Sequence, residues 1–272
     1  IGSDRPAHDS GGKGLAMSPS FGEISAALAW GAVSSVGLVV GAVAASVSRL
    51  SHHAIAMSMS VGAGLLLAAV SLKLAADAVR LAGAVPAVLF LLLGAVVFSA
   101  VNVLLARFGG ASRKRCGECV AQPSEAQQPG SGVAIALGTA LDAVPEALVL
   151  GLSLQQRIVP LELVIAFSIG NLPEALSGAT GMKAAGRSYR YIILLWGATA
   201  IGAAVAVAAG YALFGSLGES WPPRLQAFGA GALLATTAET MIPEAFHNSP
   251  RFSGFLAAIG FSVLLAVDAA TR

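Results

Sequence analysis

The chain contains eight apolar stretches, each long enough to cross a lipid bilayer as a helix. The hydrocarbon core of a bilayer is about 30 Å thick and needs about 20 apolar residues per helix. Hydrophobic residues make up 56% of the 272 positions and charged residues 11%, far below the roughly 25% charged residues of soluble domains. The stretches fall at 24–47, 54–79, 84–106, 132–153, 158–182, 190–215, 224–244 and 253–270. The sequence therefore predicts an all-α, polytopic membrane protein with eight transmembrane helices.

Two polar segments lie outside these stretches. Residues 1–20 form a polar N-terminal tail whose first residues include no initiator Met and resemble a cloning remnant, so we expect Met17 to be the native start. No charged region with a cleavage site precedes the first stretch, and we expect no removable signal peptide. Residues 21–272 are predicted to form one transmembrane domain with a single long loop at 107–131.

The positions of Lys and Arg predict the orientation in the membrane. If the N-terminus is outside, the inner loops carry nine Lys and Arg residues, whereas the outer loops and the C-terminus carry four, or six with the N-terminal tail. Cytoplasmic loops are enriched in these residues. We therefore expect both termini to be extracytoplasmic and the 107–131 loop to be cytoplasmic. The net charge of +2 is spread over short loops, so lipid, and not nucleic acid, is the expected partner.

The tripeptide Pro-Glu-Ala occurs three times inside the apolar stretches, beginning at Pro145, Pro173 and Pro243. A charged side chain at the centre of a bilayer costs about 2.5–3.5 kcal/mol on insertion scales. A proline inside a helix also leaves one backbone carbonyl without its usual donor, and that carbonyl must find another partner. The repeated motif therefore predicts a polar site that faces the inside of a helix bundle.

Four polar residues near the middle of the fourth and fifth stretches form the main candidate site. Asp142 and Glu146 are four residues apart and lie on one helical face. Asn171 and Glu174 are three apart on the next stretch. Carboxylates that face each other at low dielectric do not both stay ionised without a cation. The pattern predicts that these four residues bind a hard or borderline divalent metal, together with the carbonyls that the prolines free.

Two other interpretations of the same residues remain open at this point. Protons can neutralise facing carboxylates as well as a metal can, so proton exchange is a companion hypothesis. In the structural alternative, each carboxylate is protonated and hydrogen-bonded and only locks the helices together. Ionisable residues inside membranes are more often functional than structural, which favours the first two interpretations.

Further polar residues at the ends of the stretches are candidates for a transport path. Asp77 lies near the outer end of the second stretch, four residues after Lys73, so an ion pair within the helix is an equal alternative. Glu239, Glu244 and His247 lie toward the inner end of the seventh stretch. They are candidates for a path to the cytoplasm, although Glu244 can also be a helix end that reaches toward water.

The 107–131 loop contains a pair of cysteines, Cys116 and Cys119, directly after three basic residues. One Cys-x-x-Cys pair is half of a tetrahedral zinc site or a redox pair. The pair is a candidate for metal capture, and two pairs in a dimer would supply four ligands. The alternative is two reduced thiols in a disordered linker rich in Pro, Gln and Ser.

These features together resemble the ZIP (ZRT/IRT-like) family of divalent metal transporters, in particular its bacterial GufA-like type. The resemblance extends from about Phe21 to the C-terminus and includes the run 239–245. The family pattern His-Asn-x-Pro-Glu-Gly of the fourth span stands here as Asp-Ala-Val-Pro-Glu-Ala at 142–147. A similar pattern of the fifth span stands as Gly-Asn-Leu-Pro-Glu-Ala at 170–175.

The resemblance implies a ZIP-like bundle that carries divalent metal ions such as zinc or manganese across a bacterial inner membrane by alternating access. It also implies a homodimer, no enzymatic activity and no organic cofactor. By resemblance, Asp142, Glu146 and Glu174 line the first position of a two-metal centre midway through the membrane, and Asn171 and the shared glutamates line the second.

This chain departs from the family pattern at several ligand positions. Ala143 and Gly170 have no ligating side chain, the spans contain no histidine, and the run 201–206 of the sixth span has no glutamate. We therefore expect the second metal position to be lost and the first to be formed by oxygen atoms alone. Without imidazole, the preference should shift from zinc toward manganese or magnesium.

Three other functions are alternatives to metal transport. A transport-inactive relative with a structural or regulatory role fits the reduced ligand set. A proton-coupled carrier of another small solute fits the intramembrane carboxylates. An intramembrane hydrolase is disfavoured, because the chain has no Gly-x-Gly-Asp signature and its four histidines lie outside the apolar stretches.

Overall fold

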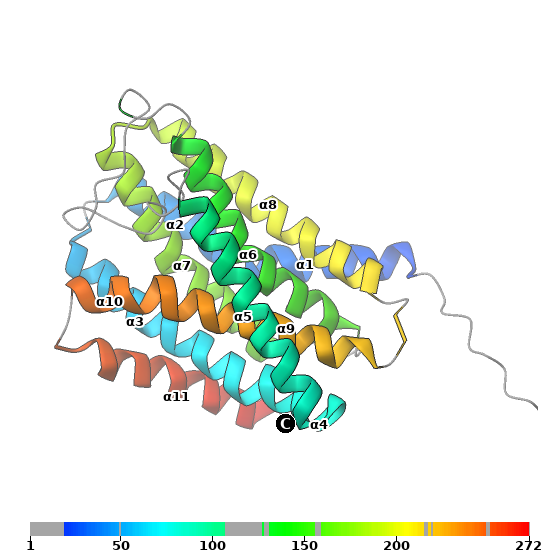
Figure 1. Ribbon diagram of the computed structural model, residues 1–272. Helices are drawn as coiled ribbons and strands as arrows, with labels where there is room; N and C mark the ends of the chain where they lie inside the picture. Colours follow the sequence, from blue (N-terminus) through cyan, green and yellow to red (C-terminus); the bar gives the residue numbers. More distant parts are fainter. Residues whose placement is uncertain are drawn as a thin grey trace, which may run out of the picture.

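The structure, a computed structural model, describes residues 19–48, 50–106, 127, 131–155, 159–214, 217–218, 220–248 and 251–271. All regular secondary structure within these residues is helical and joins into eight rods (Figure 1). In chain order the rods are α1 (Phe21–Ser34) with α2 (Val36–Val47); α3 (His52–Ala68) with η1 (Ala69–Ala75) and α4 (Ala76–Ala82); α5 (Ala84–Ala106); α6 (Ser131–Leu154); α7 (Leu161–Ala184); α8 (Tyr189–Phe214); α9 (Trp221–Thr236) with η3 (Thr237–Met241) and α10 (Ile242–Asn248); and α11 (Ser253–Thr271). The segments η1 and η3 are π-helical. The predicted all-α fold is confirmed.

Within the described ranges, six of the eight rods contain a stretch long and apolar enough to cross a membrane. These stretches are Phe21–Val47, His52–Ala82, Ala84–Leu105, Leu137–Leu154, Tyr189–Phe214 and Ser253–Thr271. The other two rods are α7 and α9–η3–α10, and they carry many of the acidic residues. Sixteen of the 24 residues of α7 are buried, and its two glutamates and its asparagine are among them. This architecture is consistent with an integral membrane protein.

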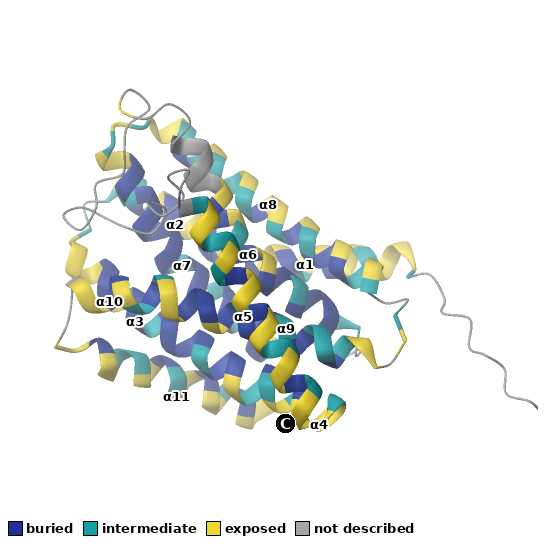
Figure 2. Ribbon diagram, in the orientation of Figure 1, coloured by how far each residue is buried: buried dark blue, intermediate teal, exposed yellow. Residues whose placement is uncertain are grey.

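Apolar side chains cover much of the outer surface. Figure 2 shows exposed residues along α5 and α11, and the exposed positions of α5 include Val85, Leu89, Leu92 and Val96. Soluble proteins rarely expose apolar patches of this extent without a partner to cover them. A lipid environment covers such a surface without cost, in agreement with the predicted membrane location.

Helix α7 lies at the centre of the bundle, against α2 on one side and α3 on another. Gly37 and Gly41 of α2 allow this close approach. A Cβ atom built at these two positions would lie 2.0 Å from the carbonyl oxygen of Ser168 and 2.4 Å from that of Leu172. Small residues at helix contacts are the usual means by which membrane helices pack closely.

Two further helix pairs, α3–α11 and α5–α9, are joined by glycines from both partners. At each of these glycines, a Cβ atom would lie 1.8–2.1 Å from a carbonyl oxygen of the facing helix. The contacts are Gly64 with Ala257 and Gly260 with Val61 between α3 and α11, and Gly94 with Phe228 and Gly231 with Leu91 between α5 and α9. Backbone therefore meets backbone along both interfaces, and no larger side chain fits there.

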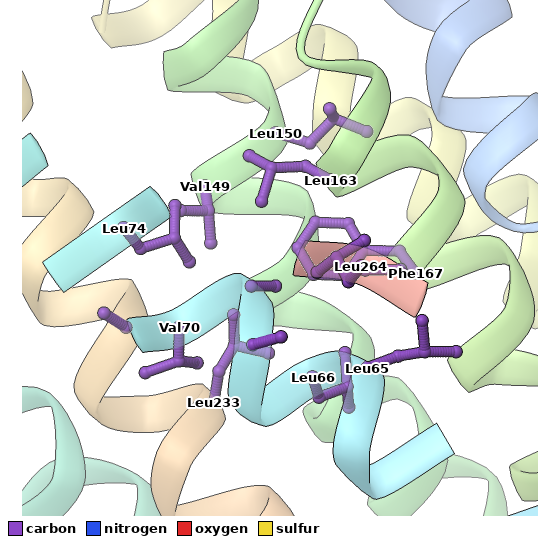
Figure 3. Packing of buried hydrophobic residues seen from close by; sticks show 14 of the residues in the cluster. Leu65, Leu66, Val70, Leu74, Val149, Leu150, Leu163, Phe167, Leu233 and Leu264 are labelled. Carbon is purple, nitrogen blue, oxygen red and sulfur yellow. The ribbon is translucent and has the colours of Figure 1, made fainter. Parts of the chain in front are cut away.

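The main hydrophobic core forms where α3, α6, α7, α9 and α11 meet (Figure 3). Leu65, Leu66 and Val70 of the second rod pack there against α6, α7 and α9. One part of this core, which we name the apolar layer, consists of Val149 and Leu150 of α6 with Leu163 and Phe167 of α7. All four side chains are fully buried.

Candidate functional site

Asn171 of α7 joins the two helices that carry the predicted site. Its side-chain amide donates one hydrogen bond to Oε2 of Glu146 on α6 at 3.0 Å and another to the backbone carbonyl of Ser34 at 3.2 Å. Asn171 and Glu146 are 3% and 8% exposed, so the contact lies in the interior of the bundle. The predicted convergence of α6 and α7 is present at this contact.

The carbonyl of Ser34 becomes available because the first rod is interrupted at Ser35. The sequence predicts one helix over 24–47, but the structure divides it into α1 and α2. The amide of Leu38 bonds the carbonyl of Ser35 at 3.0 Å instead of reaching Ser34. The hydroxyls of Ser34 and Ser35 both donate to the carbonyl of Gly31, at 2.9 and 2.8 Å. A helix interruption that exposes a backbone oxygen to an internal site recurs in membrane transporters.

The other two predicted ligands lie one helical turn from this contact. Asp142 precedes Glu146 on α6 and is 2% exposed, whereas Glu174 follows Asn171 on α7 and is 3% exposed. Pro145 and Pro173 both lie inside helices that continue past them. All four predicted residues are therefore inside the bundle, and two of them, Glu146 and Asn171, are in direct contact.

The buried polar residues continue from this site toward α10. The hydroxyl of Ser177, one turn beyond Glu174 on α7, donates to Oε1 of Glu244 on α10. Ser177 and Glu244 are both buried. We name the six residues Asp142, Glu146, Asn171, Glu174, Ser177 and Glu244 the buried polar line. Its segment on α7, from Asn171 to Ser177, covers about 9 Å at 1.5 Å per residue.

The predicted path residues separate into two groups. Glu244 belongs to the buried polar line, and His247 is exposed one turn further along α10. Glu239 instead lies on the exposed side of η3, where its carboxylate accepts hydrogen bonds from the hydroxyl of Ser99 and, at 2.8 Å, from the amide of Asn102. Glu239 therefore contacts α5 and not the buried polar line.

Asp77 forms ion pairs in the first turn of α4, away from the buried polar line. Its carboxylate lies 3.2 Å from Lys73 Nζ and 3.0 Å from a guanidinium nitrogen of Arg80. The predicted alternative, an ion pair with Lys73 within one helix, is confirmed. Lys73 also lies 3.3 Å from Oε1 of Glu162 in the first turn of α7. Glu162 was not among the predicted site residues, and its signal in the sequence is an acidic residue in the first turn of an apolar helix.

Lys183, in the last turn of α7, caps the end of α2. Its ammonium donates to the carbonyls of Ala45 at 3.2 Å, Ser46 at 2.8 Å and Ser48 at 3.1 Å. Carbonyls at the end of a helix lack donors within that helix, and a cation there also interacts favourably with the helix dipole. This role was not predicted, because it depends on which helix lies beside α7.

In the part of the chain that the structure describes, no three His, Cys, Asp or Glu side chains are grouped so that they could hold a metal ion. The amide of Asn171 connects the carboxylate of Glu146 with the backbone carbonyl of Ser34. The predicted metal-capture pair, Cys116 and Cys119, lies outside the described residues, as does most of the 107–131 loop.

No protein-family model matches the chain. No curated protein sequence matches it either.

Proposed function

We propose that the chain is a carrier for cations with eight membrane-spanning rods, and that its substrate is a divalent metal ion bound at the contact between α6 and α7. In this proposal the eight rods form a ZIP-like bundle in a bacterial inner membrane, with both termini extracytoplasmic, and two copies form a homodimer. Manganese is preferred over zinc because the ligands are oxygen atoms.

The observation that carries the proposal is the contact of Glu146 with Asn171 and, through Asn171, with the carbonyl of Ser34. These groups come from three rods and meet in the interior. Asp142 and Glu174 lie one turn away and are also buried. Oxygen atoms of carboxylates, amides and backbone carbonyls are the ligands that hard divalent ions take.

The two sides of this contact differ in a way that supports a carrier. On one side the buried polar line continues through Ser177 to Glu244, and His247 follows at the surface. On the other side the apolar layer intervenes, with Val149 and Leu150 after Glu146 on α6 and with Phe167 before Asn171 on α7. A polar route to one side and an apolar barrier to the other is the arrangement that alternating access requires in each of its end states.

Uptake of manganese and zinc into vesicles that contain the purified protein tests the proposal. We expect manganese uptake that exceeds zinc uptake, and loss of both when Glu146 or Glu174 is changed to Gln. Glu239→Gln is the matched control, since Glu239 is also a glutamate within an apolar rod but contacts α5 instead of the candidate site. Zinc carried as well as manganese, together with no effect of Asp142→Asn, contradicts the proposed site and its selectivity.

A second candidate is a transport-inactive protein with a structural or regulatory role. It is favoured by two observations: Asn171 already donates to Glu146, and no group of three ligands is present in the described ranges. A ligand that binds only the folded state raises its stability by RT ln(1 + [L]/Kd). A melting temperature that manganese, zinc and magnesium all leave unchanged would support this candidate over the carrier.

A further inference from the structure

A cavity of about 600 Å³ lies at the end of the bundle where α4 and the C-terminal end of α11 are found (Figure 1). We name it the terminal cavity. It is lined by Lys73 and Asp77 of the second rod, Ser153 of α6, Glu162 of α7 and Asp268 of α11. Three acidic side chains, the ammonium of Lys73 and the guanidinium of Arg80 therefore share one space, which no part of the proposed site uses.

Lys73 makes the contacts that join the two sides of this cavity. Its ammonium lies 3.2 Å from Asp77 on its own rod and 3.3 Å from Glu162 on α7. Among the described residues, Lys73 is the only partner of the Glu162 carboxylate, which is 7% exposed. The carboxylate of Asp77, in contrast, forms a second ion pair with Arg80. A buried carboxylate is strongly unfavourable without a cation, so Glu162 depends on this ammonium.

The terminal cavity lies in line with the candidate site. Ser153 follows Glu146 by seven residues on α6, and Glu162 precedes Asn171 by nine on α7, which correspond to about 10 and 13 Å along the two helices. The apolar layer occupies the interval between them. A cation that approached the site from this end would therefore meet the charged residues of the terminal cavity before the apolar layer.

We propose that Asp77 and Glu162 form a cation-binding site whose occupant is the ammonium of Lys73, and that this ammonium is a latch that holds η1 to α7 and closes the terminal cavity. The latch is inferred only from the ion pairs of Lys73 with Asp77 and Glu162. Its consequence for transport, that an arriving cation must displace Lys73, rests on the proposed function.

Thiol labelling of a cavity residue tests the latch without any measurement of transport. The reporter is Ser153→Cys in full-length protein whose Cys116 and Cys119 are changed to Ser, and the probe is a charged thiol reagent. Lys73→Ala should raise the labelling rate about tenfold or more, because the buried pair is broken and the cavity opens. Ethylammonium chloride, which replaces the missing amine, should restore slow labelling, whereas sodium chloride at the same concentration should not.

Two controls separate the latch from a general loss of structure. Ser60→Cys, a buried reporter on α3, should label equally slowly with and without Lys73. In the double variant Lys73→Ala and Glu162→Gln, ethylammonium should not change the labelling rate of Ser153→Cys. If the Ala variant does not fold, Lys73→Met keeps an unbranched side chain one atom shorter and removes the ammonium, and it should also accelerate labelling at Ser153→Cys.

Unchanged labelling at Ser153→Cys, equal acceleration at Ser60→Cys, or sodium as effective as ethylammonium would each overturn the latch. The protein could instead show accelerated labelling that ethylammonium reverses and yet carry no cation into vesicles. That result would support the latch and refute the proposed function. The two proposals therefore fail by different results.

Discussion

The side-chain amide of Asn171 donates to Glu146 across the interface between α7 and α6, at 3.0 Å and away from solvent. The same amide also reaches the carbonyl of Ser34, which the interruption between α1 and α2 makes available. One asparagine thus connects three rods at the point where the sequence predicts the functional centre. Its removal affects both stability and the chemistry of the carboxylate.

Asn171→Ala should lower the free energy of unfolding by about 1–3 kcal/mol, since a buried carboxylate and a buried carbonyl each lose one hydrogen-bond donor. Thermal unfolding in detergent measures the change. A double-mutant cycle with Glu146→Ala, which removes the acceptor, should give a coupling energy of about 0.5–3 kcal/mol, as expected for residues in direct contact. Additive effects of the two substitutions would show that the contact contributes no energy of its own.

Gly64→Ala should destabilise the protein by about 1–3 kcal/mol, the usual cost of overpacking. The new Cβ atom would lie 1.9 Å from the carbonyl oxygen of Ala257, so α3 and α11 must separate. Gly202→Ala is the matched control, because a Cβ atom there meets nothing within 4 Å. Thermal unfolding of both variants checks the prediction, which fails if the two substitutions have equal effects.

Lys183→Met should lower stability by about 1 kcal/mol, because the carbonyls at the end of α2 lose a cationic cap. Hydrogen exchange should become faster at residues 44–48 and stay unchanged in α5. Arg190→Met, an exposed cation near the start of α8, should change neither quantity. Equal exchange at residues 44–48 in wild type and Lys183→Met would contradict the capping role.

Glu244→Gln should reduce manganese uptake by about tenfold or more, since hydrogen bonds to charged groups contribute about 1.5–3 kcal/mol. Glu239→Gln should leave uptake unchanged, because that carboxylate lies outside the buried polar line. Uptake into vesicles compares the two variants at equal protein content. A larger loss with Glu239→Gln would place the path along α5 and refute the assignment of the polar line.

Asp142→His should raise zinc uptake relative to manganese, because imidazole is a ligand that suits zinc better than manganese. Asp142→Asn keeps an oxygen ligand at the same position and should not raise the zinc ratio. Competition between the two metals in one uptake assay measures the ratio directly. An unchanged ratio in Asp142→His would show that this residue does not contact the substrate.

The rods and their interior faces could be predicted because both follow from local sequence. The predicted stretch 158–182 corresponds to α7, and 84–106 corresponds to α5. Asp142 and Glu146 were predicted to share a face from their spacing alone, and both are buried. A carboxylate in an apolar stretch has few favourable places, so its burial among other helices is a strong expectation.

Other features of the fold and of the candidate site depend on contacts between segments that are distant in the sequence, and they could not be predicted. The interruption at Ser35 has a weak signal in the pair Ser34 and Ser35, but its use by Asn171 depends on how α7 lies against α1 and α2. Glu239 and Glu244 look alike in the sequence, and the π-helical segment η3 directs the first toward α5. Identical residue types in one short run thus acquire different surroundings.

Helix α7 is fastened at both of its ends to different rods. Glu162 in its first turn is tied to Lys73 of η1, and Lys183 in its last turn is tied to the end of α2. Axial sliding of α7 would have to break one tie or carry a second rod with it. A rearrangement around the central carboxylates that keeps both ties is therefore a tilt or rotation of α7 between these two anchors, or a joint displacement of α7 with α2, along which Gly37 and Gly41 already bring the two backbones together.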